Sequence, residues 1–207
     1  MKTLVYIPFA AIMLAGPALA QDDGLYAAVA DPNTAYVRVI GPDATTAVVQ
    51  NVAFNQLTNG ISPYVPITGG DELVVSAMEQ ETRAPAAPGT FTTVLVSADG
   101  SGVVLPDTIT KSPAQADLIF YNMSDIAAAD LYVPAASAVA VPAVASEGSG
   151  AVALRAPLTL DFEAREGDTV LASISGIALE RREGMTIVLR GTGGAYELVA
   201  MPNQVAN

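Results

Sequence analysis

The residue types that most often carry out catalysis in proteins are scarce in this sequence. It contains neither histidine nor cysteine, which excludes Ser-His-Asp and Cys-His catalysis and zinc sites of the usual histidine and cysteine type. Lysine occurs only at positions 2 and 111, so a Ser-Lys dyad is disfavoured. We therefore expect a protein that is not an enzyme and that uses no cofactor.

Carboxylates are the remaining candidates for chemistry. Asp161, Glu163 and Glu166 lie close together in the sequence, but the alternation around them places them on the wet side of a strand and in its turn. No aromatic pocket is predicted there to raise one pKa, which argues against a glycosidase pair. Asp22-Asp23 and Asp168 could supply oxygens to calcium, yet the spacing of an EF-hand loop is missing. No metal site is predicted, although calcium binding stays open.

The elements that would position such residues are short β-strands. Runs of four to eight residues rich in valine, threonine and isoleucine are separated by turns containing many of the 17 Gly and 14 Pro, as in sandwiches and barrels. Alternation in Leu158–Ala164 places Leu158, Leu160 and Phe162 on one face. The segment Gln80–Gly89 reads as a proline-rich loop. The predicted fold is all-β, with two tandem β-sandwich domains of the Ig-like or jelly-roll-like kind.

The sequence also repeats its own plan. Asp117–Ser124 has the character of Ala35–Ile40, a short apolar and aromatic run that stops at turn residues. Late in each half, a strand after a glycine leads through a glycine turn into a last strand that ends near Pro106 or Pro202. We therefore predict a first domain over residues 21–107, a linker over 108–116 and a second domain over 117–207.

The first 20 residues have the pattern of an export signal. Lys2 precedes an apolar stretch that is too short to span a bilayer comfortably, and Ala18-Leu-Ala20 supplies the small residues that signal peptidase requires. Cleavage after Ala20 would place the mature protein in the periplasm. No later segment has the length and hydrophobicity of a membrane span.

The charge balance narrows the class of partner. The formal net charge is −12 at pH 7, which repels phosphate backbones and anionic lipid surfaces. Nucleic acid and bare membrane are therefore poor candidates.

Several segments resemble one known family. Gly24-Leu-Tyr26, then Ala35–Ile40, and later Ile177–Gly184 running into the next strand, are similar to segments of the AlgF family, periplasmic accessory proteins of the bacterial alginate O-acetylation machinery. This resemblance implies a non-catalytic adaptor that binds and coordinates acetyltransferase components, in the periplasm or in the membrane, that act on an alginate-like exopolysaccharide. The chain departs from the family in its strong acidity and in its alanine-rich stretch 127–145.

An adaptor should contact its partners through exposed aromatic and arginine side chains. The candidate contacts are Tyr26, Tyr36, Arg38, Arg181 and Arg182. Tyr26 could instead pack on its own domain, Arg38 could be a charge that protects an edge strand, and Arg181-Arg182 could be a solvated turn or could meet an acidic polysaccharide. Two other functions stay open: an extracellular structural or adhesive sandwich, and a carbohydrate-binding module.

Overall fold

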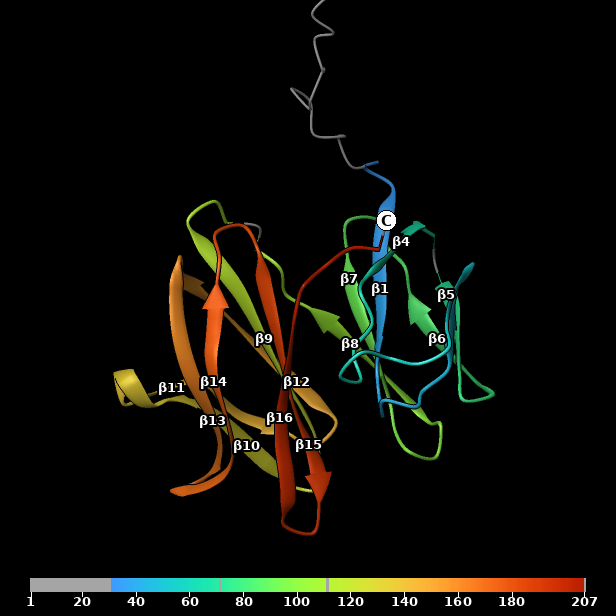
Figure 1. The fold of residues 1–207 in the computed structure, drawn as a ribbon. Helices are drawn as coiled ribbons and strands as arrows, with labels where there is room; N and C mark the ends of the chain where they lie inside the picture. The colour runs from blue at the N-terminus through green and yellow to red at the C-terminus, as the bar shows by residue number, and fades with distance from the viewer. Residues whose placement is uncertain (1–30, 71, 111, 207) are drawn as a thin grey trace, which may run out of the picture. The chain divides into compact units, whose positions relative to one another are not determined.

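The predicted β-strands form throughout the part of the chain that the structure describes, a computed structural model of residues 31–70, 72–110 and 112–206 (Figure 1). The first eight strands are β1 (Thr34–Ile40), β2 (Ala47–Val49), β3 (Val52–Phe54), β4 (Val65–Thr68), β5 (Glu72–Ala77), β6 (Gln80–Pro85), β7 (Phe91–Val96) and β8 (Gly102–Asp107). The next eight are β9 (Gln115–Ser124), β10 (Ala128–Val133), β11 (Ala138–Ala145), β12 (Gly148–Arg155), β13 (Leu158–Glu166), β14 (Thr169–Leu179), β15 (Gly184–Thr192) and β16 (Ala195–Pro202). A single 3₁₀ turn, η1 (Pro134–Ala136), joins β10 to β11.

The strands form two β-sandwiches with the same topology. In the first, the sheets have the strand orders β4-β1-β7-β8 and β3-β2-β5-β6. In the second, the orders are β12-β9-β15-β16 and β11-β10-β13-β14, which is the first plan shifted by eight strands. The first strand of each sandwich pairs in parallel with the seventh, β1 with β7 and β9 with β15. The predicted all-β fold with two tandem sandwiches is confirmed.

Alternation along the central strands sends side chains into two different apolar cores. On β9, Leu118 and Phe120 pack inside the second sandwich, whereas Ile119 and Tyr121 belong to a separate cluster outside it. All four side chains are buried. A strand in a sheet with only one buried face would leave every second residue exposed, so the sheet that contains β9 is covered on both faces.

The cover on the outer face of β9 is the corresponding sheet of the first sandwich. Ile40 and Leu95 from the first sandwich pack with Ile119, Tyr121 and Val188 from the second. The two sheets that contain the parallel strand pairs are therefore the inner layers, and the sheets around β2 and β10 are the outer layers. Burial of these large apolar side chains stabilises the contact by about 1.5–3 kcal/mol each as an upper estimate.

The chain crosses between the two sandwiches twice. The segment of residues 108–114 connects the end of β8 to the start of β9. After β16 the chain returns to the first sandwich: the Tyr64 amide donates to the Gln204 carbonyl at 2.8 Å and the Ala206 amide donates to the Tyr64 carbonyl at 2.7 Å. This C-terminal crossing adds backbone hydrogen bonds to the apolar contact between the inner sheets.

One segment differs from its predicted structure. Gln80–Pro85 is the edge strand β6, antiparallel to β5, and not part of a loop. Its side chains are mostly polar and exposed, so it has no apolar alternation to reveal it. Pro85 is tolerated because it ends an edge strand, where no further neighbour needs its missing amide donor.

Three features that the sequence analysis singled out lie near the N-terminus. The predicted export signal of residues 1–20, Tyr26, and the Asp22-Asp23 pair all lie outside the described residues. Within the described part of the chain, no helix is long and apolar enough to cross a bilayer.

Candidate functional site

A buried polar cluster lies between the two sandwiches, centred on Arg38. This residue lies in the middle of β1 and is 1% exposed. Its Nε donates to Thr93 Oγ1 at 2.8 Å, one terminal nitrogen donates to Thr186 Oγ1 at 2.7 Å, and the other donates to the Tyr121 hydroxyl at 2.9 Å. Thr93 belongs to the first sandwich, whereas Thr186 and Tyr121 belong to the second. The guanidinium group therefore connects the two inner sheets.

Asp107, at the end of β8, supplies the negative charge of this cluster. Its Oδ2 lies 3.9 Å from Arg38 Nη2, and both side chains are essentially excluded from solvent. The carboxylate also accepts hydrogen bonds from the hydroxyls of Tyr64 at 2.7 Å and Thr93 at 2.5 Å, and from the Tyr121 hydroxyl. A buried charge is tolerated only when it is paired and fully hydrogen-bonded, and this carboxylate meets both conditions.

Aromatic rings cover the guanidinium of Arg38. Its Cζ lies 4.3 Å from the centre of the Tyr64 ring and 5.3 Å from that of Tyr121. Burial, reinforced by Asp107, raises the pKa of both phenols above the usual value of 10.0. Burial opposes the charge of Arg38, but Tyr121, Tyr64 and Asp107 outweigh it and the pKa of Arg38 is raised. The cluster is therefore one neutralised unit that holds the sandwiches together, and it has no activated nucleophile.

Both interpretations of Arg38 from the sequence need correction. It does not protect an edge, because β1 lies between β4 and β7 in its sheet. It is also not an exposed contact, because it is enclosed by the second sandwich. Tyr36 is similarly covered: its ring stacks on Phe91 with a centroid distance of 4.4 Å and an interplanar angle of 5°, and only 9% of the residue is exposed.

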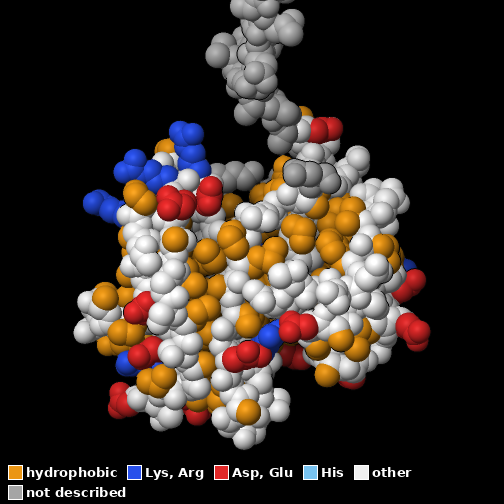
Figure 2. All heavy atoms as spheres, in the orientation of Figure 1, with side chains coloured by type: hydrophobic (Ala, Val, Ile, Leu, Met, Phe, Trp, Pro, Cys, Tyr) orange, Lys and Arg blue, Asp and Glu red, His pale blue; other side chains and the backbone are white. Residues whose placement is uncertain are grey.

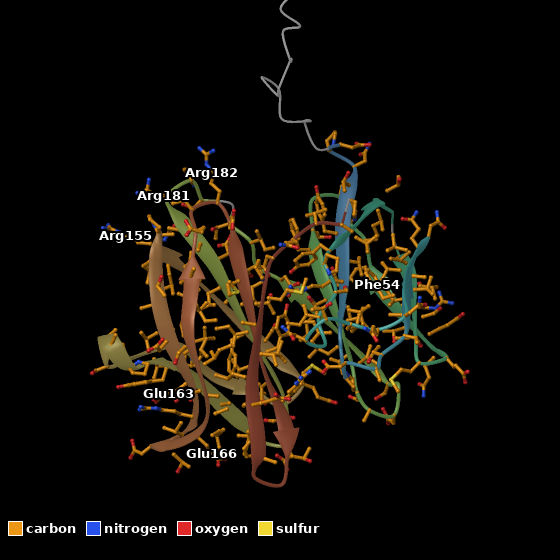
Figure 3. The ribbon with its side chains drawn as sticks, in the orientation of Figure 1. Phe54, Arg155, Glu163, Glu166, Arg181 and Arg182 are labelled. Carbon is orange, nitrogen blue, oxygen red and sulfur yellow. The ribbon has the colours of Figure 1, made fainter. Side chains whose placement is uncertain are left out.

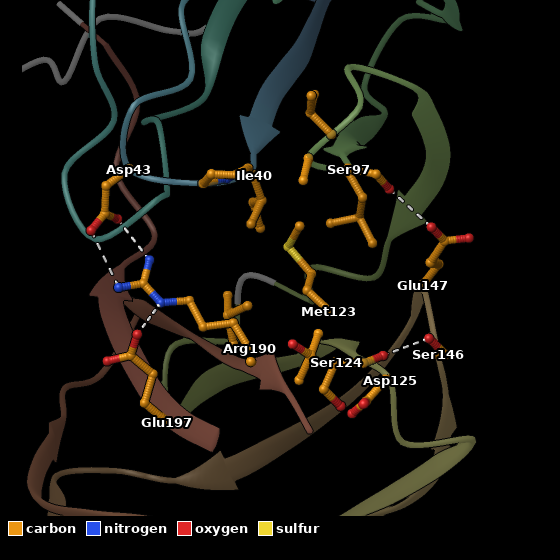
Figure 4. A pocket seen from close by; sticks show the side chains of 18 of the residues that line it. Ile40, Asp43, Ser97, Met123, Ser124, Asp125, Ser146, Glu147, Arg190 and Glu197 are labelled. Carbon is orange, nitrogen blue, oxygen red and sulfur yellow. Dashed lines mark hydrogen bonds and ion pairs between the residues drawn. The ribbon is translucent and has the colours of Figure 1, made fainter. Parts of the chain in front are cut away.

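A hollow of about 580 Å³ opens at one end of the junction between the sandwiches (Figure 4). Its apolar lining includes Ile40, Leu95, Met123 and Val188, which continue the apolar cluster between the inner sheets. The carboxylates at its rim already accept hydrogen bonds from other side chains of the protein. The volume is that of a small-molecule site, but most of the polar side chains that line it already hydrogen-bond within the protein.

Arg190 makes salt bridges with two of these rim carboxylates, and one of the two salt bridges joins the sandwiches. Its two terminal nitrogens donate to the Asp43 carboxylate at 2.6 and 3.3 Å, and its Nε donates to Glu197 Oε1 at 2.7 Å (Figure 4). The hydrogen bond to Asp43 raises the pKa of Arg190 despite partial burial. Ser97 donates to Glu147 Oε1 at 2.9 Å on the opposite side. A carboxylate is a weak base for a serine hydroxyl, so this pair is a further link between the sandwiches.

The acidic residues singled out in the sequence do not form a catalytic pair. Glu163 makes a salt bridge to Arg165, whose Cζ lies 3.5 Å from the centre of the Tyr132 ring. Asp161 accepts a hydrogen bond from the Gly176 amide at 2.8 Å. Among the described residues, no group of three or more acidic side chains is arranged to hold a metal ion.

Arg181 and Arg182 are exposed in the turn between β14 and β15, which joins the two sheets of the second sandwich. The structure adds Arg155, the exposed last residue of β12, to the same end of the second sandwich (Figure 3). Figure 2 shows these basic side chains gathered there with acidic side chains beside them. We refer to Arg155, Arg181 and Arg182 as the arginine patch. Sequence inspection missed Arg155 because 26 positions separate it from Arg181 and only the pairing of β12 with β9 brings them close.

Comparison with known proteins gives weak structural similarities, two of which are described below. No protein-family model matches the chain, and no curated protein sequence matches it. A structure of the C-terminal domain of AlgF from P. aeruginosa is 18% identical, with a TM-score of 0.39, and the match covers 43% of this chain and 98% of that one. A candidate cell adhesion protein from Bacteroides ovatus is 10% identical, with a TM-score of 0.32, and its match covers 83% of this chain and 98% of that one.

Proposed function

We propose that this protein is a non-catalytic adaptor, which acts by binding other molecules and holding them in a fixed arrangement. The observation that carries the proposal is the buried cluster around Arg38 and Asp107. Buried charged groups are the usual place to look for catalytic chemistry, yet here every bond of the cluster connects one sandwich to the other or stabilises that connection. The absence of histidine and cysteine from the sequence supports the same conclusion.

The connected sandwiches suit an adaptor for a mechanical reason. Interfaces between domains of one chain are often polar enough to allow relative motion. This junction combines an apolar cluster, a buried charge network, the Arg190–Asp43 salt bridge and the C-terminal crossing. Partners bound to the two outer sheets would therefore be kept at a constant separation and orientation, which lowers the entropic cost of assembling them.

The finer proposal is that the partners are proteins that O-acetylate an exopolysaccharide of the alginate type. It is supported by the resemblance of Gly24-Leu-Tyr26, Ala35–Ile40 and Ile177–Gly184 to the AlgF family. Acetyl transfer requires an activated nucleophile, and the sequence offers no histidine or cysteine to act as base or nucleophile. The proposed division of labour leaves the transfer to the partner proteins, in the periplasm or in the inner membrane, and the assembly to this chain.

The proposal is tested by affinity capture with residues 21–207 as bait. Extracts of periplasm and of solubilised inner membrane are passed over the bait, and bound proteins are identified by mass spectrometry. We expect an acyltransferase-type protein that is absent when the bait is the heat-unfolded chain. Capture of cell-surface components alone, or of the chain itself alone, would contradict the adaptor role and favour an adhesive protein.

A further inference from the structure

The arginine patch is built from two separate parts of the second sandwich that meet at one strand. Arg155 is the register partner of Gln115, the first residue of β9. On the other side of β9, the Arg182 amide donates to the Gln115 carbonyl at 3.1 Å. Adjacent strands are about 4.8 Å apart, so the backbones of Arg155 and Arg182 lie about two strand spacings apart. The sheet thus places the arginines in a row across its end.

These three arginines differ from every other described cation. Arg38, Arg83, Arg165 and Arg190 each make a salt bridge. Within the described residues, Arg155, Arg181 and Arg182 make none, and all three are exposed. Arg181 Nε donates to the Ala156 carbonyl at 2.8 Å, which holds its side chain beside the end of β12 without neutralising its charge. The patch is therefore positively charged on a protein whose net charge is −12.

A partner for this surface needs an anionic group that matches guanidinium. Arginine presents a planar fork of donors that binds a carboxylate through two parallel hydrogen bonds. A row of such forks fits a linear chain that carries carboxylates at regular intervals. A flat anionic membrane is a poorer match, because it would meet the negative charge of the whole molecule as well as the patch.

The surroundings of the patch favour a hydrophilic ligand over a folded protein. Protein interfaces are organised around a desolvated apolar or aromatic centre. The exposed residues within two positions of the three arginines in the sequence are Pro157, Glu180 and Glu183, and none of them offers a large aromatic or aliphatic anchor. We propose that Arg155, Arg181 and Arg182 form a binding site for a carboxylate-bearing polysaccharide, a polymer of uronic acids.

The proposal is tested with the purified chain of residues 21–207 and a soluble uronic acid oligomer, by isothermal titration calorimetry at low and at physiological salt. We expect saturable binding that weakens as salt rises, because exposed charges are screened. Replacing all three arginines with alanine should weaken binding at least about tenfold. The matched control is Arg83→Ala, an exposed arginine on the first sandwich that is paired with Glu72, and it should leave binding unchanged.

Two further variants separate this site from a loss of folding. The double variant Arg155→Ala/Arg182→Ala leaves the Arg181–Ala156 hydrogen bond in place and should still weaken binding at an unchanged melting temperature. Glu180→Gln/Glu183→Gln removes two exposed carboxylates from the same turn and should tighten binding severalfold, since it lowers the repulsion of the polyanion. A tighter complex cannot result from misfolding.

Three outcomes would overturn the proposal. They are no binding of the uronic acid oligomer, binding that the triple variant retains, and equally tight binding of poly-glutamate, which would mean that the site responds to charge alone. Neutral dextran serves as the blank. The inference is independent of the adaptor role, because the assay contains no partner protein: polymer binding can fail while protein capture succeeds, and the reverse.

Discussion

The molecule uses arginine in two opposite ways. Arg38 lies buried between the sandwiches, with its nitrogens bonded to side chains on both sides and Asp107 beside it. The arginine patch lies exposed at the end of the second sandwich, and within the described residues it has no carboxylate partner. Burial makes an unpaired charge prohibitively costly, so Arg38 must be completely bonded and can only hold the structure together. Exposure removes that requirement and leaves a guanidinium available for a ligand.

The largest expected effect on stability comes from replacing the buried arginine, Arg38. Arg38→Met removes the only cation that the structure places beside Asp107 among the described residues. Removing one partner of a buried ion pair costs about 3–5 kcal/mol of unfolding free energy. Urea denaturation followed by circular dichroism measures this loss. The double variant Arg38→Met/Asp107→Asn should recover part of it, and a loss below about 1 kcal/mol would show that the network does not connect the sandwiches.

Alkaline pH should weaken the same cluster without any mutation. The pKa values of Tyr64 and Tyr121 are raised above 10.0 in the folded protein, chiefly by burial. Their contribution to stability is therefore complete below pH 10 and is lost as the pH rises above it, because only the unfolded chain can then release these protons. Urea midpoints measured at about pH 8 and about pH 10.5 give the test. Replacing both tyrosines with phenylalanine should reduce this pH dependence, and an unchanged dependence would contradict the assignment.

A smaller effect is expected at the rim of the hollow. Arg190 bridges the two sandwiches through Asp43, whose side chain is 60% exposed. Exposed ion pairs contribute about 1 kcal/mol or less, so Arg190→Ala should lower the unfolding free energy by about that amount. If the salt bridge limits motion at the junction, hydrogen exchange of β1 and β15 amides should also increase. Arg165→Ala, whose salt bridge lies within the second sandwich, is the control and should leave β1 unaffected.

The smallest effect on stability is expected at the arginine patch. Arg155→Ala and Arg182→Ala change exposed side chains that make no salt bridge to any described residue. Surface substitutions of this kind change the unfolding free energy by about 0.5 kcal/mol or less. Thermal denaturation should therefore be unchanged while polymer binding falls. A large drop in melting temperature would show that the arginine patch stabilises the fold, as Arg38 does, and would contradict this prediction.

The sequence alone determined the local features of the fold. Alternation in Leu158–Ala164 correctly predicted a strand with one buried face, since a period of two requires no knowledge of neighbours. The parallel between Ala35–Ile40 and Asp117–Ser124 correctly indicated two sandwiches of one plan. The absence of histidine and cysteine by itself excludes catalysis and zinc sites that need these residues. These inferences need only residue types and their order.

Tertiary structure alone decided what each charge does. Arg38 has the same local pattern whether its face of β1 meets solvent or a second sheet, and only the packing of β9 against β1 made it a buried link. Arg155 joined Arg181 and Arg182 only through the register of β12 and β9. A charge depends for its role on solvent and partners, and both are set by residues far away in the sequence. Composition gives the number of arginines in this chain, but only the pairing of its strands distinguishes those that form salt bridges within the described residues from those that do not.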